Sequence, residues 1–261
     1  MNTIKVMTFN IRYGQAKDGM NHWDHRKELV IDRIRTFDPD LLGLQECRDD
    51  EQAEFIKQNL PDYDFFGVRR GGTGETALEM APLLVRRSAF HLRDHGNFWL
   101  SVTPEIPGSR SWDSAFPRTV TWAGLNHLSS GRSLIFLNTH VDYMPAANDA
   151  STRLLLDWID RLDPPLPVIL TGDFNAIKDS ATYRQLAKGG RLADAYRQVH
   201  PSSAAEGTFH GFGLPGVLLT IDWIVISKEF ETLEAFIDTW HEGDRYPSDH
   251  YPVITTLRWQ P

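Results

Sequence analysis

Hydrophobic residues recur along the chain in short runs, each followed by turn residues or a polar cluster, which is typical of β-strands. These runs predict strands at Ile4–Phe9, Leu41–Leu44, Tyr63–Val68, Ala81–Val85, Val120–Leu125, Ser133–Leu137, Pro167–Leu170, Leu218–Ile226 and Val253–Leu257. Apolar residues at helical spacing predict helices at Arg26–Thr36, Glu51–Asn59, Asn148–Leu162 and Ser180–Lys188. Strands therefore outnumber helices.

The sequence shows no division into separate units. It contains no low-complexity tract, no Gly/Ser-rich linker and no block of like charge that would mark a boundary. We therefore expect one domain spanning residues 1–261. The least patterned stretches are Arg69–Glu79, Ser101–Phe116 and Ser202–Gly216, and loops of this length in a compact domain are often functional.

The composition excludes several classes of protein. The net charge of −8 works against non-specific nucleic-acid affinity, because that affinity comes from Lys and Arg displacing phosphate counterions. A single cysteine, Cys47, allows no intramolecular disulfide and no Cys-rich zinc site. No apolar run approaches the ~20 residues of a membrane span, and the N-terminus lacks a signal-peptide layout. We expect a soluble, cytoplasmic protein without membrane insertion, acting as a monomer.

Polar side chains interrupt the chain most abruptly at the ends of predicted strands. Four strands end in amides, carboxylates or an imidazole, and two further acids lie in or beside later strands; the residues are Asn10, Glu46, His140, Asp173, Asn175, Asp222, Asp249 and His250. Strand ends that converge on one edge of stacked sheets can combine such groups into a single rigid site. The pattern therefore indicates one polar site built from distant segments.

The motifs around these residues resemble, in order, those of the endonuclease/exonuclease/phosphatase superfamily. They are Thr-Phe-Asn10, Leu-Gln-Glu46, Asn-Thr-His140, Gly-Asp173-Phe-Asn175, Ile-Asp222 and Ser-Asp249-His250. No single motif is decisive, but the ordered set spans residues 5 to 257. The segments Gly108–Asp113 and Thr208–Phe212 are similar to those of small bacterial members. The resemblance implies a four-layered α/β sandwich, with two mixed β-sheets packed face to face and helices outside.

The resemblance also implies a divalent metal ion. Hydrolysis of a phosphate ester needs charge compensation, and Mg²⁺ held by one or two carboxylates and waters suits that need. In superfamily members with this pattern, the position of Glu46 holds the metal with help from Asn10. Asp249 would hold a second metal or help to orient the site. We expect Mg²⁺, with Mn²⁺ as a substitute, and the sequence leaves one or two ions open.

The same resemblance assigns catalytic roles. Asp173 would orient and deprotonate the attacking water, and Asn175 would donate a hydrogen bond to a non-bridging oxygen of the transition state. His250 would donate to the phosphoryl oxygen, with Asp222 fixing and charging its ring, because a carboxylate partner raises the pKa of histidine. His140 would be another phosphate donor.

Four further residues are weaker candidates for substrate binding. Glu79 is similar to a glutamate that lies near the substrate in many superfamily members. Arg118 and Arg70 could contact a phosphate, although each could equally be a solvated surface arginine. Trp112 could form an aromatic wall, although packing beneath a loop is an equal alternative. Tyr143 departs from the pattern, because close relatives tend to have histidine there.

The sequence thus predicts a Mg²⁺-dependent phosphoesterase, and two substrate classes compete. The acidic balance and the lack of a Lys/Arg-rich stretch favour a small-molecule or lipid-type phosphate ester. The alternative is a nuclease similar to abasic-site endonucleases, 3′-exonucleases or deadenylases, for which nucleic acid would be the partner. A non-catalytic binding protein on the same scaffold is disfavoured because the catalytic set is complete. A zinc hydrolase is weaker still, because no histidine pair occurs on a predicted helix.

Overall fold

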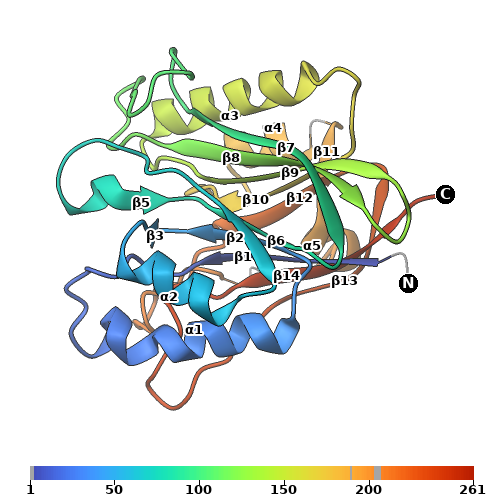
Figure 1. Ribbon diagram of the computed structural model, residues 1–261. Coiled ribbons are helices and arrows are strands. Elements are labelled where there is room, and N and C mark those ends of the chain that lie inside the picture. Colours follow the sequence, from blue (N-terminus) through green and yellow to red (C-terminus); the bar gives the residue numbers. More distant parts are fainter. Residues whose placement is uncertain (1–2, 189, 203–206) are drawn as a thin grey trace.

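Two six-stranded β-sheets lie face to face at the centre of the structure (Figure 1). The structure is a computed structural model and describes residues 3–188, 190–202 and 207–261. In spatial order, the first sheet contains β13 (Phe230–Ile237), β14 (Val253–Trp259), β1 (Thr3–Asn10), β2 (Leu41–Gln45), β6 (Leu83–Arg86) and β4 (Tyr63–Phe66). The second contains β11 (Leu192–Asp194), β12 (Asp222–Ser227), β10 (Val168–Asp173), β9 (Ser133–His140), β8 (Thr119–His127) and β7 (Phe90–Trp99). One parallel pair in each sheet, β1–β2 and β9–β10, makes both sheets mixed.

The strand sequences explain why the sheets are buried on both faces. In β1, Ile4 and Val6 belong to the apolar cluster between the sheets, whereas Met7 and Phe9 belong to the cluster beneath the outer helices. Successive side chains of a strand point to opposite faces, so a strand with few polar residues can supply both clusters. The inter-sheet cluster also contains Phe136 of β9.

Helices cover the outer face of each sheet (Figure 1). Val30 and Ile34 of α1 (Trp23–Phe37) and Ile56 of α2 (Glu51–Asn59) pack with the first sheet. Leu155 of α3 (Pro145–Asp160) and Leu186 of α4 (Ala181–Lys188) pack with the second. The predicted four-layered sandwich is therefore confirmed. Among the described residues, no helix has both the length and the apolar character needed to cross a bilayer.

Short elements complete the fold. The strands β3 (Cys47–Arg48) and β5 (Glu79–Met80) form a separate two-stranded sheet. The 3-10 helices are η1 (Gly19–Asn21) and η2 (Glu75–Leu78), and α5 (Ala195–Val199) follows β11 directly.

Among the described residues, the sequence pattern misses β7, β11 and β13, which lie at the edges of their sheets, and the two-residue strands β3 and β5. An edge strand is partly exposed, and β7 accordingly contains the polar residues Arg93, Asp94 and His95. The predicted strand Leu218–Ile226 begins only at Asp222, because the preceding segment belongs to a loop that runs past the strand ends.

A buried polar bridge joins the two sheets just beneath the ends of β2, β9 and β10. The side-chain oxygen of Asn138 accepts hydrogen bonds from Gln45 Nε2 at 2.7 Å and Thr171 Oγ1 at 3.0 Å. Its Nδ2 donates to the carbonyls of Leu44 and Pro82, at 2.6 and 3.0 Å. Buried polar groups are costly when unpaired, so these bonds favour one alignment of the two sheets.

This bridge leaves no space for a side chain at position 43, which is occupied by Gly43. A Cβ there would lie 2.2 Å from Thr171 Oγ1 and 2.5 Å from Asn138 Oδ1. We predict that Gly43→Ala destabilises the protein by about 1 to 3 kcal/mol, as overpacking does in other cores. Gly14→Ala is the matched control, because its nearest neighbour, Gln52, would lie at an ordinary 3.4 Å. Urea unfolding measures both, and equal stability of the two variants would contradict the role of the bridge.

Candidate active site

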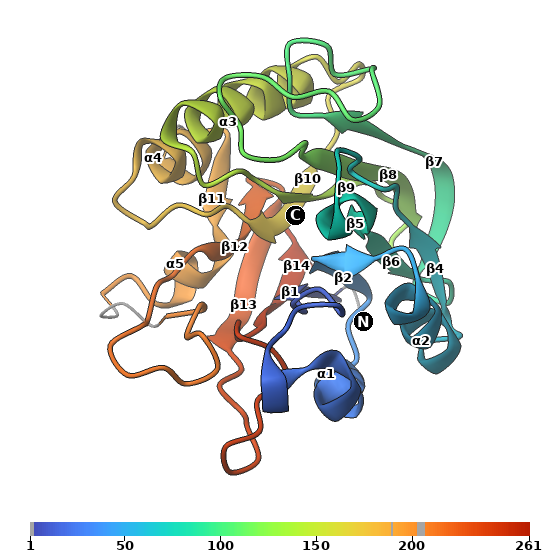
Figure 2. The same ribbon diagram turned by 90° about the vertical axis from the view of Figure 1, so that its left-hand side faces the viewer.

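The ends of β1, β2, β9 and β10 meet at one edge of the sandwich, which faces the viewer in Figure 2. Asn10, at the end of β1, connects the two sheets there. Its Nδ2 donates to Glu46 Oε1 at 3.2 Å and to Asp173 Oδ2 at 3.0 Å. The structure therefore brings together side chains from residues 10, 46 and 173, as the strand-end pattern predicts.

Glu46 follows the last residue of β2 in a left-handed conformation, with φ of 59°. Such a conformation is uncommon for a non-glycine residue and is concentrated at functional sites. Its Oε2 accepts a hydrogen bond from the backbone N–H of Tyr13 at 3.1 Å. Burial raises the pKa of Glu46, but Arg12, His250 and its hydrogen bonds outweigh burial and lower the pKa below its usual value. The carboxylate is thus kept ionised.

Asp173 is almost fully buried at the end of β10. Its Oδ1 accepts a hydrogen bond from the backbone N–H of Asn175 at 2.9 Å, so both carboxylate oxygens are held by donors. Burial, followed by the negative charge of Asp222, raises the pKa of Asp173 to about 7. A carboxylate with this pKa can both take up and release a proton near neutral pH.

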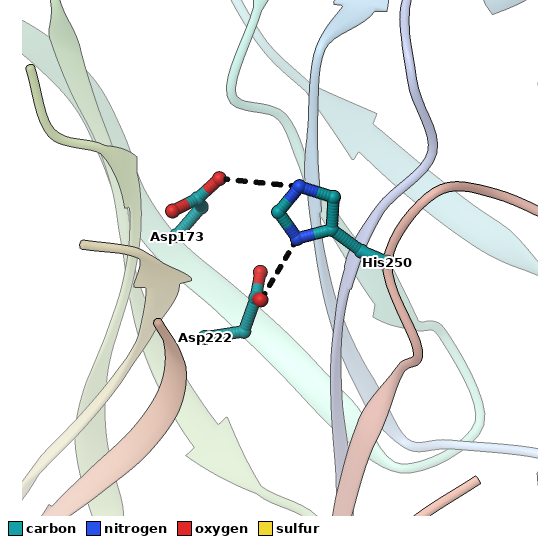
Figure 3. Close-up of side chains that lie close together, drawn as sticks. All are labelled: Asp173, Asp222 and His250. Atoms are coloured by element: carbon teal, nitrogen blue, oxygen red, sulfur yellow. Dashed lines mark hydrogen bonds and ion pairs between the residues drawn. The ribbon is translucent and has the colours of Figure 1, made fainter. Parts of the chain in front are cut away.

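His250 lies between two carboxylates, as Figure 3 shows. Its Nδ1 donates to Asp222 Oδ2 at 2.8 Å, and its Nε2 lies 3.9 Å from Asp173 Oδ2. Burial lowers the pKa of His250, but Asp222, then Asp173 and Asp249, outweigh burial and raise it to about 10. The ring is therefore a cation whose Nε2 faces Asp173.

Two interpretations of this group are open on distance alone. Ligand atoms of Asp173, Asp222 and His250 all lie within 4.8 Å of one another, a spacing that a metal ion could use. However, a metal needs a neutral imidazole nitrogen, whereas His250 is protonated and already donates to Asp222. We therefore interpret Asp222 and His250 as a hydrogen-bonded pair whose charged ring lies at ion-pair distance from Asp173.

Glu46 and Asp173 offer oxygen ligands suited to a divalent cation. Both carboxylates contact Asn10, and carboxylate oxygens are the ligands that Mg²⁺ prefers. The residues thus fit such a cation. Asn10 presents Nδ2 to both carboxylates, while its Oδ1 accepts from the N–H of Arg12 at 3.0 Å. Asp249 Oδ2 lies 3.7 Å from Arg12 Nε, so an arginine already compensates its charge.

His140 and Asn175 form a pair next to Asp173. Asn175 Nδ2 donates to the carbonyl of Val141 and lies 3.0 Å from His140 Nε2, which is itself 3.5 Å from Asp173 Oδ2. Burial, then the positive charges of Arg118 and Arg70, lower the pKa of His140 well below its usual value. His140 is therefore neutral, in contrast to His250.

These groups open onto a cleft of about 360 Å³. The expected substrate-binding residues Glu79, Arg70 and Arg118 line it, and so does Tyr143, whereas Trp112 is not among its lining residues. A larger pocket of about 810 Å³ adjoins it at Leu219, but its lining contains neither Glu46 nor Asp173. We therefore assign the chemistry to the smaller cleft.

The cleft also contains residues that the sequence analysis did not identify. Arg12 and Tyr13 line it directly after Asn10, and Phe209, Leu219 and Ile221 form an apolar wall beside His250. Phe209 belongs to the segment Thr208–Phe212, which resembles a segment of small bacterial family members. That resemblance was the one sequence signal that could have pointed to Phe209 as a cleft residue. Arg12 has φ of 52°, a backbone feature that the sequence does not reveal.

Known proteins share both the fold and the sequence pattern. The Endonuclease/Exonuclease/phosphatase family matches residues 7–250. The structure is similar to an endonuclease/exonuclease/phosphatase from Bacteroides vulgatus, with a TM-score of 0.90, 29% identity and full coverage of both chains. It is also similar to a mannosyl-6-phosphatase from Bacteroides thetaiotaomicron, with a TM-score of 0.87 and 30% identity over 98% of this chain and 100% of that one.

Among curated proteins, the CCR4-Not complex 3′-5′-exoribonuclease subunit Ccr4 of Emericella nidulans is 23% identical over 89% of this chain. The chain spans only 43% of the length of that relative. The chain belongs to the endonuclease/exonuclease/phosphatase family. Members of this family are hydrolases that act on phosphoester bonds, and they generally depend on a divalent metal ion.

The charge of His250 depends on Asp222, and this dependence can be measured without an activity assay. We predict that Asp222→Asn lowers the pKa of His250 by about one to three pH units in an NMR titration. His127, whose pKa depends on burial and on the charge of Asp40 and not on Asp222, should be unaffected and serves as the internal control. An unchanged His250 titration would contradict the pairing.

The same pairing affects stability. The folded pKa of about 10 lies above the ~6.5 of an unfolded histidine, so the pair stabilises the fold fully below pH ~6.5. This stabilisation is lost as the pH rises through 10. The destabilisation caused by Asp222→Asn should therefore be larger at pH ~6 than at pH ~10.

Proposed function

We propose that the protein is a Mg²⁺-dependent phosphoesterase that hydrolyses small-molecule or lipid-type phosphate esters. The observation that carries this proposal is the arrangement around Asp173, which contacts Asn10 and Asn175 and lies next to protonated His250. The cleft volume of about 360 Å³ is in the range of small-molecule sites. The net charge of −8 and the likeness to a mannosyl-6-phosphatase also support a small substrate.

Glu46 would be the principal ligand of Mg²⁺ or Mn²⁺, because its pKa is lowered and its carboxylate stays ionised. Asn10 would help by holding Glu46 and Asp173, and could offer its own oxygen if its amide turned. When bound, the ion compensates the charge that develops on the phosphoryl group and its leaving oxygen. Asp249 would orient the site through Arg12 and Ser248, whose Oγ lies 3.2 Å from Asp249 Oδ1.

Asp173 would accept the proton of the attacking water. Donors fix both of its oxygens, so the carboxylate is oriented before substrate binds. Its pKa of about 7 suits a general base, because a base works best when its pKa is near the working pH. His250 Nε2 lies 3.9 Å from Asp173 Oδ2 and would donate its proton to a phosphoryl oxygen as charge develops there.

Asn175 and His140 would complete the phosphoryl site. One amide proton of Asn175 is bound to Val141 O, and a phosphoryl oxygen would replace His140 as partner of the other. His140 is neutral, so it would contribute a hydrogen bond without adding charge. Two donors that are already positioned in a buried cleft stabilise the charge of the transition state more effectively than donors in water.

A nuclease is the second candidate, and the likeness to an exoribonuclease subunit favours it. The apolar wall of Phe209, Leu219 and Ile221 could stack against a base. A comparison of single-stranded RNA and abasic duplex DNA with small phosphate esters separates the two candidates.

Removal of the proposed base gives the most direct mutational test. Asp173→Asn keeps the shape of the side chain but removes its ability to accept a proton. We predict that kcat for Mg²⁺-dependent hydrolysis of bis(p-nitrophenyl) phosphate falls by about 100- to 10,000-fold. Asp179→Asn, an exposed position in the segment that follows β10, should retain wild-type kcat. Retention of substantial turnover in folded Asp173→Asn would reject Asp173 as the base.

Metal binding should depend on Glu46. We predict that Glu46→Gln weakens Mg²⁺ binding by about tenfold or more in isothermal titration calorimetry, because a neutral amide is a poorer ligand than a carboxylate. The Mg²⁺ concentration for half-maximal activity should rise in parallel. Glu51→Gln, exposed at the start of α2, is the control. An unchanged metal titration would rule out Glu46 as ligand.

A further inference from the structure

Two buried arginines line one wall of the cleft. The side chains of Arg70 and Arg118 are only 6% and 5% exposed, and their guanidinium groups lie 4.6 and 5.6 Å from the centre of the Phe116 ring. Burying a guanidinium is costly unless its charge and its donors are matched. Each guanidinium has one carboxylate partner, so the question is whether these partners satisfy all of its donors.

The protein partners of Arg118 leave one of its buried donors unused, whereas no such donor is found on Arg70 among the described residues. Arg70 donates to Glu79 Oε1 and to the carbonyl of Thr76, both at 3.0 Å. Arg118 donates through Nε to Asp142 Oδ2 at a long 3.4 Å. Within the described part of the chain, the buried Nη1 of Arg118 has no hydrogen-bond partner.

Asp142 has little capacity left for Arg118. Its carboxylate already accepts from the backbone N–H groups of Ala115 and Phe116 at 3.2 Å and Met144 at 3.0 Å. An unpaired buried donor carries a desolvation cost, and this cost is larger for a charged group. An anion that accepted from Arg118 Nη1 would remove this cost.

The arginine wall is distinct from the groups that surround the reacting phosphate. The charges that act most strongly on His250 are Asp222, Asp173 and Asp249. Those that act most strongly on His140 are Arg118 and Arg70. Arg70, Arg118 and His140 also line a small recess that Asp173 and His250 do not line.

We propose that Arg118 and Arg70 form a second anion-binding subsite, which selects substrates that carry a second phosphate or a carboxylate in addition to the hydrolysed ester. A guanidinium presents donors in a planar fork that matches the oxygens of either group. The proposal rests on the proposed phosphoesterase function. It narrows the substrate class to phosphate esters with two anionic groups.

The test compares matched ligands that differ in the second anion. Each ligand is measured as a competitive inhibitor of the Mg²⁺-dependent hydrolysis of bis(p-nitrophenyl) phosphate. One pair is fructose 1,6-bisphosphate and fructose 6-phosphate, and the other is 3-phosphoglycerate and glycerol 3-phosphate. The first pair tests a second phosphate, and the second pair tests a carboxylate. For each pair, the inhibition constant of the ligand with one anionic group is divided by that of the ligand with two. A general change in activity affects both constants equally and cancels from this ratio.

In the wild type, the ligand with two anions should bind about tenfold more tightly in at least one pair, as expected for a charge-assisted hydrogen bond. In Arg118→Gln this ratio should fall to near one. Arg118→Lys keeps the charge and folds more readily, and should give an intermediate ratio because it lacks the fork. Arg69→Gln is the matched control, since Arg69 is exposed and paired with Asp49, and its ratio should equal that of the wild type.

A wild-type ratio near one in both pairs would overturn the subsite. A ratio that stays at the wild-type value in both Arg118 variants would also overturn the subsite. Arg118 would then act on the reacting phosphate and affect both ligands equally. Absence of metal-dependent hydrolysis of bis(p-nitrophenyl) phosphate by the wild type would instead overturn the phosphoesterase itself. The two failures are therefore distinguishable.

Discussion

The site depends on the buried polar bridge between the two sheets. Asn138 connects Gln45 of the first sheet to Thr171 of the second, beneath the strand ends that carry the site. Glu46 directly follows Gln45, and Asp173 lies two residues after Thr171. Since the chemistry requires groups from both sheets in contact, a shift of one sheet against the other would separate Glu46 from Asp173. Hydrophobic packing alone is non-directional and would tolerate such a shift.

Next to this bridge, the buried surroundings raise the pKa values of Asp173 and His250 for different reasons. Burial and the nearby charge of Asp222 raise the pKa of Asp173 to about 7. The same Asp222 raises the pKa of His250 to about 10. The site thus places a group that can accept a proton next to one that holds a proton, which is the arrangement expected for acid and base roles in one reaction. His140, beside two arginines, is kept neutral by contrast.

The sequence pattern predicted most of the central strands, and the resemblance to the family implied the layers of the fold. The structure also brings together Asn10, Glu46 and Asp173, which the strand-end pattern had singled out. The strongest signal in the sequence was the placement of Asn10, Glu46 and Asp173 at strand ends, because the carboxyl ends of neighbouring parallel strands lie at one edge. The signal failed where structure depends on contacts distant in the chain. The edge strand β7 is partly solvated and lacks an apolar pattern, and the cleft takes Phe209 rather than Trp112 because loop paths are set by packing. The roles of the individual site residues stay predictions.

The central claim is that these strand ends form one metal-dependent site for small phosphate esters. The most direct measurement is the initial rate of the wild-type protein, with Mg²⁺ or with a chelator, on p-nitrophenyl phosphate, its bis-ester, sugar phosphates, phospholipid head-group esters, single-stranded RNA and abasic duplex DNA. The account predicts hydrolysis that requires the metal and is faster on a small ester than on either nucleic acid. Turnover that persists in chelator, or metal-dependent cleavage of nucleic acid alone, would contradict it.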